Sequence, residues 1–146
     1  MTLIEVEVVK AVRAPVTMAF IRRVIQEASR VREVAARLPN RPVTVAVRLT
    51  DDSEMERLNT YEHHATDVLS FSGWGEHLGD IAISWPAVQR QARDYGHTAE
   101  TELALLCVHA LLHLLGWDHY EEIETREMWR LTLKGLKRSG LTISPR

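Results

Sequence analysis

The amino-acid sequence predicts an α/β (α+β) fold: a single domain in which a mixed sheet of about four strands carries packed helices. The chain has 146 residues, of which 45% are hydrophobic, and this is the size and composition of one ordinary domain. Segments with apolar residues at alternate positions, typical of strands, are interspersed with segments that repeat every three or four residues, typical of helices. No repeat or low-complexity linker divides the sequence, so we expect residues 1–146 to form one domain.

The first third of the chain predicts a strand, a long helix and a second strand. Apolar residues alternate over 3–9, as in a strand with one buried face. Over 20–38 they recur every three or four residues, which predicts one long amphipathic helix that Pro39 and Pro42 close. Residues 43–49 alternate again and predict the second strand.

The middle of the chain predicts a short helix and two neighbouring strands. Ser53 and Glu56 have the spacing of a capping box, which predicts a helix that reaches about Asn59. Residues 66–71 and 79–84 are short segments rich in β-branched and aromatic residues. A glycine-containing loop separates them, so we expect these two strands to be neighbours in the sheet.

Three helices complete the prediction. Ser84 and Pro86 are typical of a helix start, and Gly96 is typical of its end. Thr98 caps the next helix, and a last helix covers about 121–137.

The helix after Thr98 is the most apolar part of the chain. Its apolar run, 103–115, is 13 residues long and contains two histidines, which predicts a buried helix and excludes a membrane span. Cys107 lies in this run and is the single cysteine, so it cannot form an internal disulfide and we expect an inert buried thiol. Residues 1–10 lack the basic start and long apolar core of a signal peptide. These features predict a cytoplasmic protein.

Overall charge gives no sign of a nucleic-acid-binding protein, because the formal net charge is −2 and the isoelectric point is near 6.4. Basic residues nevertheless cluster in the first third and in the last helix: Arg22, Arg23, Arg30, Arg32, Arg37, Arg41, Arg126, Arg130, Lys134, Lys137 and Arg138. Glutamates are interspersed with both clusters. The sequence leaves two interpretations open, a solvated helix face with ion pairs and a phosphate-binding surface.

The most informative segment is HALLHLLGWDH, residues 109–119, which predicts a metal site. His109 and His113 are four residues apart, so a helix places them on one face, about 5–6 Å apart at Cβ. Gly116 lets the chain leave the helix and turn, which brings His119 back to the same ion. We therefore expect the three imidazoles to bind one Zn²⁺ per chain. The alternatives are a core-facing histidine cluster and a pH-sensitive packing element.

The remaining aromatic and imidazole side chains near this segment have simpler interpretations. Trp117 is expected to pack in the core. The other four histidines are expected to be surface polar residues: His63, His64, His77 and His97.

Three histidine ligands favour hydrolytic chemistry over a structural metal site. They leave one coordination position open for water and leave the ion its full double charge, which favours attack on anionic phosphodiesters. The same ligand spacing occurs in metzincin proteases, which carry a glutamate directly after the first histidine as general base. That position is Ala110 here. Loss of a general base costs about two to four powers of ten in rate, which argues against a protease.

Asp118, next to His119, is the one carboxylate inside the motif. It has three interpretations: a hydrogen-bond partner that orients a ligand imidazole, a general base, or a residue that shapes the turn after the helix.

Together with two upstream segments, the motif resembles a known family. HALLHLLGWDH preceded by ATDVLSF at 65–71 and LGDIAIS at 78–84 is similar to the YbeY family of zinc-dependent endoribonucleases, in which HGxLHLxGYDH, TDVLSF and GDI recur in that order. The resemblance implies a cytoplasmic, single-strand-specific endoribonuclease in ribosomal RNA maturation, notably of the small-subunit RNA, and in ribosome quality control. Ribosomal RNA and the ribosome or its small-subunit proteins are the implied partners.

The resemblance also implies roles for particular residues. It implies that the zinc ligands are His109, His113 and His119. It further implies that the 66–71 strand forms one wall of the substrate cleft beside the metal helix, with Thr66, Asp67 and Ser70.

One departure from the family pattern bears on activity. The family carries an arginine after LNxxY that is thought to act on the substrate phosphate, whereas Glu62 follows Tyr61 here in a shorter segment. Arg57 and His64 are the residues nearby that could approach the site instead. A second hypothesis is therefore a ribosome-associated metalloprotein that binds RNA without cutting it, and a third, resting on ligand spacing alone, is the protease.

Overall fold

The computed structural model describes residues 4–60 and 66–143, and these form one α+β domain with a four-stranded mixed sheet, as predicted. The elements in chain order are β1 (Ile4–Lys10), α1 (Met18–Ala28), α2 (Arg32–Arg37), β2 (Val43–Thr50), α3 (Asp52–Leu58), β3 (Val68–Ser72), β4 (His77–Ser84), α4 (Trp85–Tyr95), α5 (Ala99–Leu114) and α6 (Glu122–Lys137).

The strands have the order β1-β2-β4-β3. β1, β2 and β4 run parallel, with Val6 opposite Val45 and Val47 opposite Ile81. β3 runs antiparallel to β4, with Ser70 opposite Ile81, and is an edge strand of the sheet. The expected neighbours 66–71 and 79–84 are therefore paired, and β3 leaves one edge open beside the helices.

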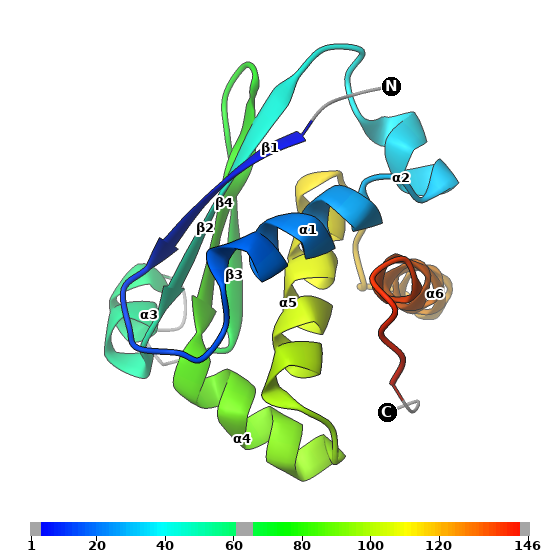
Figure 1. The fold of residues 1–146 in the computed structure, drawn as a ribbon. Coiled ribbons are helices and arrows are strands. Elements are labelled where there is room, and N and C mark those ends of the chain that lie inside the picture. Colours follow the sequence, from blue (N-terminus) through cyan, green and yellow to red (C-terminus); the bar gives the residue numbers. More distant parts are fainter. Residues whose placement is uncertain (1–3, 61–65, 144–146) are drawn as a thin grey trace.

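The helices α1, α5 and α6 lie on the same side of the sheet (Figure 1). α1 and α5 contact the strands, and α6 packs on α1 and α5 from outside, which gives the order sheet, inner helices, outer helix. Strand side chains alternate between the two faces, so the buried valines and isoleucines of β1, β2 and β4 face these helices. The opposite face carries exposed polar side chains, among them those of Glu5, Glu7, Arg48 and Asp80.

α5 is buried on nearly every side because it contacts β3, β4, α1, α4 and α6. Its fully buried leucines, Leu103, Leu111 and Leu112, are among the largest side chains of the core. This surrounding structure explains why the most apolar segment of the chain is a helix without a polar face. None of the helices in the described ranges is long and apolar enough to cross a bilayer.

The single long helix predicted over 20–38 is wrong, because the structure has two helices with a break at 29–31. α1 ends at Ala28, where the Ser29 hydroxyl donates to the carbonyl of Gln26 at 2.6 Å. Val31 is extended and buried, and α2 starts directly after it. The apolar spacing continues on both sides of the break, so periodicity did not reveal it.

The predicted cap of the short helix is also wrong. α3 is capped by Asp51, whose carboxylate accepts a hydrogen bond from the backbone N–H of Glu54 at 2.9 Å. Ser53 lies inside the helix and accepts instead from Arg57 at 3.1 Å. The other predicted helix ends are confirmed, with Ser84, Gly96 and Thr98 at the positions expected.

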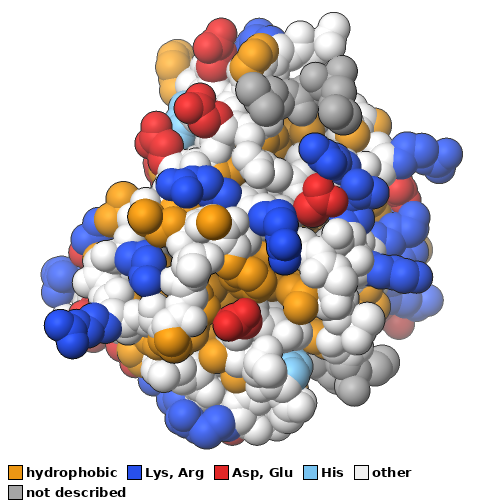
Figure 2. Space-filling view, viewed as in Figure 1, with side chains coloured by type: hydrophobic (Ala, Val, Ile, Leu, Met, Phe, Trp, Pro, Cys, Tyr) orange, Lys and Arg blue, Asp and Glu red, His pale blue; other side chains and the backbone are white. Residues whose placement is uncertain are grey.

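Most of the clustered basic residues of α6 have acidic partners on α1 and α2. Glu33 pairs with Arg130 at 2.9 Å and with Lys134 at 3.3 Å, and Arg138 lies 3.4 Å from Glu27. Figure 2 shows Lys and Arg side chains gathered at the edge of the molecule where Figure 1 places α6, with acidic side chains among them. For these residues the ion-pair interpretation is the one that the contacts favour.

We expect the ion pair cluster around Glu33 to make stability pH-dependent in acid. A hydrogen bond from backbone N–H in the first turn of α2 and donation from Arg130 lower the pKa of Glu33 from 4.5 to about 2. A carboxyl whose pKa is lower in the folded chain stabilises the fold above its unfolded pKa and loses that contribution as pH falls toward its folded pKa. The free energy of unfolding should therefore fall less between pH 5 and pH 2 in Glu33→Gln than in the parent, measured by urea unfolding.

Glu122→Gln, which removes an exposed carboxylate on α6, is the matched control and should lose as much stability as the parent does. Equal losses in Glu33→Gln and the parent would contradict the assignment.

Candidate metal centre

The three histidines of the sequence motif converge in space. His109 and His113 lie on successive turns near the end of α5, and His119 returns toward them from the following loop. One ligand atom of each ring lies within 4.8 Å of the others. Ring centroids are 4.7 Å apart for His109 and His113, 5.0 Å for His113 and His119, and 5.8 Å for His109 and His119. The three imidazoles could therefore hold one metal ion.

The turn that returns His119 has a defined geometry. Gly116 has a φ of +95°, a left-handed conformation that side chains disfavour. Its N–H donates to the His113 carbonyl at 3.0 Å, and the Trp117 N–H donates to the Leu112 carbonyl at 3.0 Å, which together close the end of α5. The Trp117 ring is buried as predicted, and the guanidinium of Arg37 lies 3.7 Å from its centroid. This packing fixes the direction in which the chain leaves the helix.

The electrostatics of the site favour a neutral imidazole at His113. Burial, followed by the neighbouring His119, lowers the pKa of His113, although Asp118 acts in the opposite direction. A neutral ring offers the lone pair that a metal requires. Three imidazole nitrogens within 4.8 Å of one another are a donor set that suits Zn²⁺. The residues present therefore fit the metal that the sequence motif predicts.

Asp118 stabilises the loop after α5 by a hydrogen bond to the next residue, His119. Its Oδ1 accepts a hydrogen bond from the backbone N–H of His119 at 2.7 Å. The carboxylate thus shapes the turn that carries His119, which is one of the three interpretations considered from the sequence. A part for Asp118 in proton transfer stays a prediction.

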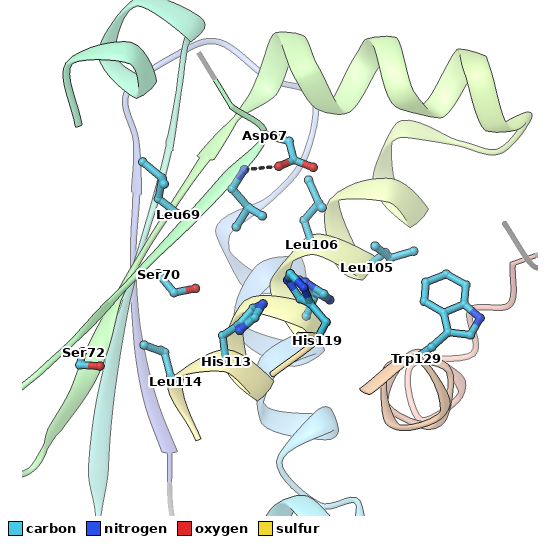
Figure 3. Close-up of a pocket in the computed structure, with 12 residues that line it drawn as sticks. Asp67, Leu69, Ser70, Ser72, Leu105, Leu106, His113, Leu114, His119 and Trp129 are labelled. Carbon is cyan, nitrogen blue, oxygen red and sulfur yellow. Dashed lines mark hydrogen bonds between the residues drawn. The ribbon is translucent and has the colours of Figure 1, made fainter. Parts of the chain in front are cut away.

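The histidines border a cavity of about 540 Å³ between β3 and α5. Figure 3 shows His113 and His119 between Ser70 on one side and Trp129 on the other, so β3 and α6 form opposite walls. The residues that line the cavity are Asp67, Val68, Leu69, Ser70, Ser72, Leu105, Leu106, His109, His113, Leu114, His119 and Trp129. The space is open enough for an extended ligand to reach the histidines, and its walls are partly apolar.

Of the three predicted cleft residues, Asp67 and Ser70 line this cavity, and Thr66 is outside its described lining. The Thr66 hydroxyl lies 3.5 Å from Asp67 Oδ1, which also accepts from the N–H of Val68 at 2.8 Å. Gln91 donates to Asp67 Oδ2 at 3.1 Å. These contacts hold Asp67 at the start of β3.

Comparison with known proteins assigns this architecture to a family. The sequence profile of the YbeY family, described as Endoribonuclease YbeY, matches residues 6–140. The chain belongs to the YbeY family. The Endoribonuclease YbeY of Roseiflexus castenholzii is 39% identical over 158 aligned positions, which cover 94% of this chain and 96% of that protein. The Endoribonuclease YbeY of Shouchella clausii is 42% identical over 117 positions, which cover 66% of this chain and 72% of that protein.

A solved structure supports the fold of this YbeY family member. The solution structure of a Thermotoga maritima protein superposes with a TM-score of 0.60 at 24% identity, and covers 94% of this chain and 88% of that one. At this identity the likeness concerns the fold alone.

Of the histidines expected on the surface of this YbeY chain, His97 differs from the expectation. His97 was expected on the surface, but its Nε2 lies 2.6 Å from Oε1 of the fully buried Glu102, and only 14% of its side chain is exposed. The expectation for His97 is wrong, because a carboxylate placed five residues later in an apolar helix needs a polar partner. His77 is half-buried in β4 and contacts Thr44 and Asp80.

The other sequence candidates of the YbeY chain lie away from the histidines or outside the described structure. Cys107 is fully buried, and burial raises the pKa of its thiol to about 12, in keeping with an inert side chain. Arg57 lies on α3, which contacts β4 and α4, and donates to Ser53 on its own helix. Tyr61, Glu62, His63 and His64 lie outside the described residues.

Proposed function

We propose that this chain is a single-strand-specific endoribonuclease that uses one Zn²⁺ bound by His109, His113 and His119. The observation that carries the proposal is the convergence of these imidazoles at the border of an open cavity, in a chain whose family is described as endoribonuclease. Both walls of the cavity come from elements far apart in the sequence, and they leave room for a strand of nucleic acid to pass the histidines.

The chain's own residues supply binding and positioning. A metal ion bound here would supply a Lewis acid for the phosphodiester and would activate the attacking water. Leu105, Leu106 and Leu114 form an apolar wall beside the histidines, which strengthens electrostatic contacts by excluding water. Ser70 and Ser72 present hydroxyls on the opposite wall, where they can hydrogen-bond ribose or phosphate oxygens. Asp118 holds the loop of His119 and, as the one carboxylate in the motif, is the residue to which we assign a proton-transfer role.

Phosphodiester cleavage fits the site better than peptide cleavage. Ala110 follows His109 where a metzincin protease has its general base, and its side chain is fully buried in the core. The site therefore lacks, at that position, the group that passes a proton to a leaving amine.

We further propose that the substrate is ribosomal RNA, in particular precursors of the small-subunit RNA, and that residues 1–146 act as one cytoplasmic domain. The ribosome or its small-subunit proteins would then be the partners. The support is the family membership and the three-part motif of the sequence. Glu62, at the position where the resemblance implies an arginine, favours a second candidate function: a ribosome-associated metalloprotein that binds RNA without cutting it.

A cleavage assay with three substrates tests the proposal. The zinc-loaded protein is incubated with an end-labelled single-stranded fragment of small-subunit ribosomal RNA, with the same fragment annealed to its complement, and with unstructured casein. We expect cleavage of the single strand only, loss of cleavage with a chelator, and recovery when zinc is added back. RNA that is retained but stays intact at every zinc loading would support the binding protein, and digestion of casein with intact RNA would support the protease.

A further inference from the structure

A second groove adjoins the metal centre on the side of α6. It has a volume of about 370 Å³ and is lined by His109, His119, Thr125, Arg126, Met128 and Trp129. His109, His119 and Trp129 also line the larger cavity toward β3. The two spaces therefore meet at the histidines, with β3 bordering one side and the first turns of α6 the other.

The groove combines an aromatic face with a single positive charge. Trp129 is half-buried: it packs against the hydrophobic core and also borders both spaces. In Figure 3 its indole stands on α6 across from His119. Met128, which is buried, contributes to the apolar floor. The basic side chain in the described lining is Arg126, so an anion that enters the groove meets a guanidinium.

Arg126 is available to such an anion, unlike several basic residues further along α6. Its contact is to Glu122 at 2.8 Å on the same helix, and the two side chains are 71% and 82% exposed. Pairs this exposed contribute little to stability, so a phosphate can displace the carboxylate at small cost. Arg130, one turn later, is held by both Glu33 and Glu127.

The start of α6 is tied to the metal centre. The Thr125 hydroxyl lies 3.1 Å from the carbonyl of His119 and 2.9 Å from that of Glu121. α6 also packs directly on α5, which carries His109 and His113. Trp129 and Arg126 therefore stand at a fixed place relative to the point where the imidazoles converge.

We infer that this groove binds the nucleotide of a single-stranded RNA that adjoins the phosphate at the metal centre. The base stacks on Trp129 and the neighbouring phosphate pairs with Arg126. This inference rests on the proposed function, since it extends the path of the substrate from the β3 side across the histidines. Stacking accepts any base but requires an unpaired one, so the groove would favour single strands without reading their sequence.

Binding of a short single-stranded oligodeoxynucleotide tests the groove separately from ribonuclease activity. Its affinity for the zinc-loaded protein is measured by fluorescence anisotropy, and its integrity is checked afterwards on a gel. We expect Trp129→Leu and Arg126→Gln each to weaken binding about tenfold. Arg126→Lys should recover only part of the loss, because an ammonium lacks the forked donor geometry.

Two matched controls lie outside the groove. Trp74→Leu removes a tryptophan that is 92% exposed at the β3–β4 turn, and Lys137→Gln removes an exposed cation about 16 Å further along α6. Both should bind as the parent does. Zinc content and melting temperature, measured for every variant, show whether Trp129→Leu keeps its fold. If Trp129→Leu does not fold, the oligonucleotide affinity of Arg126→Gln alone tests the groove.

The outcomes separate the groove from the nuclease. If the parent cuts RNA and Arg126→Gln binds the oligonucleotide as tightly as the parent does, the inference about the groove is wrong. The proposed function is unaffected by that result. If the parent cuts no RNA, and Trp129→Leu and Arg126→Gln each bind the oligonucleotide more weakly than the parent does, the result supports the groove. It then also supports the second candidate function, a protein that binds RNA without cutting it. A parent that cuts RNA but does not bind the oligonucleotide overturns the groove alone, and a parent that neither binds the oligonucleotide nor cuts RNA overturns both.

Discussion

Replacement of His113 by alanine should remove metal binding and RNA cleavage together. His113 is half-buried in α5 and stands within 5.0 Å, centroid to centroid, of both His109 and His119. Without it two imidazoles remain, and no third nitrogen of the motif can take its place. We expect cleavage to fall by more than about 100-fold, since loss of a residue that only orients a ligand already costs 10- to 100-fold.

The measurement is zinc per chain after dialysis, made beside the cleavage rate on the single-stranded fragment. His77→Ala is the matched control, because His77 lies in β4 and contacts Thr44 and Asp80. It should keep stoichiometric zinc and the parent rate. Added zinc should raise the melting temperature of the parent and of His77→Ala, because a ligand that binds only the folded chain stabilises it, and should not raise that of His113→Ala. Full zinc content in His113→Ala would contradict the assignment of the ligands.

The convergence of the three histidines could be predicted from sequence because its geometry is local. All three histidines fall within 109–119, where the helical period sets the first pair and one glycine sets the return of the third. The observed φ of Gly116 and the hydrogen bonds that end α5 are the features on which the prediction depended. Asp67 and Ser70 were proposed from the family resemblance, because nothing local places β3 beside α5.

The features that sequence did not reveal depend on contacts between distant segments. The break after Ala28 follows from burial of Val31, and a continuous apolar period cannot distinguish this from an unbroken helix. Trp129 and Arg126 come after the motif in a helix whose orientation is set by packing on α1 and α5. Their approach to the histidines is visible only once α6 has been placed.

The contact between His97 and Glu102 was also not predicted from sequence, although the two residues are only five apart, and it lies at the start of the helix that carries His109 and His113. Glu102 is fully buried and its Oε1 lies 2.6 Å from Nε2 of His97. Removal of one member of a buried ionisable pair is costly, because the other keeps its desolvation penalty without the lost contact, whereas replacement of both by apolar residues is often nearly neutral. We therefore expect His97→Ala to lower the free energy of unfolding by about 3 kcal/mol.

The double variant His97→Leu with Glu102→Leu should lose much less than His97→Ala, and the comparison is made by urea unfolding at pH 7. Glu100→Leu changes an exposed carboxylate in the first turn of the same helix and is the matched control, with an expected effect within about 0.5 kcal/mol. Because Glu102 lies about 10 Å along the helix from His109, zinc content should be unchanged in all folded variants. A double variant at least as unstable as His97→Ala would show that the carboxylate stabilises the helix by other contacts, and that the imidazole is not its main partner.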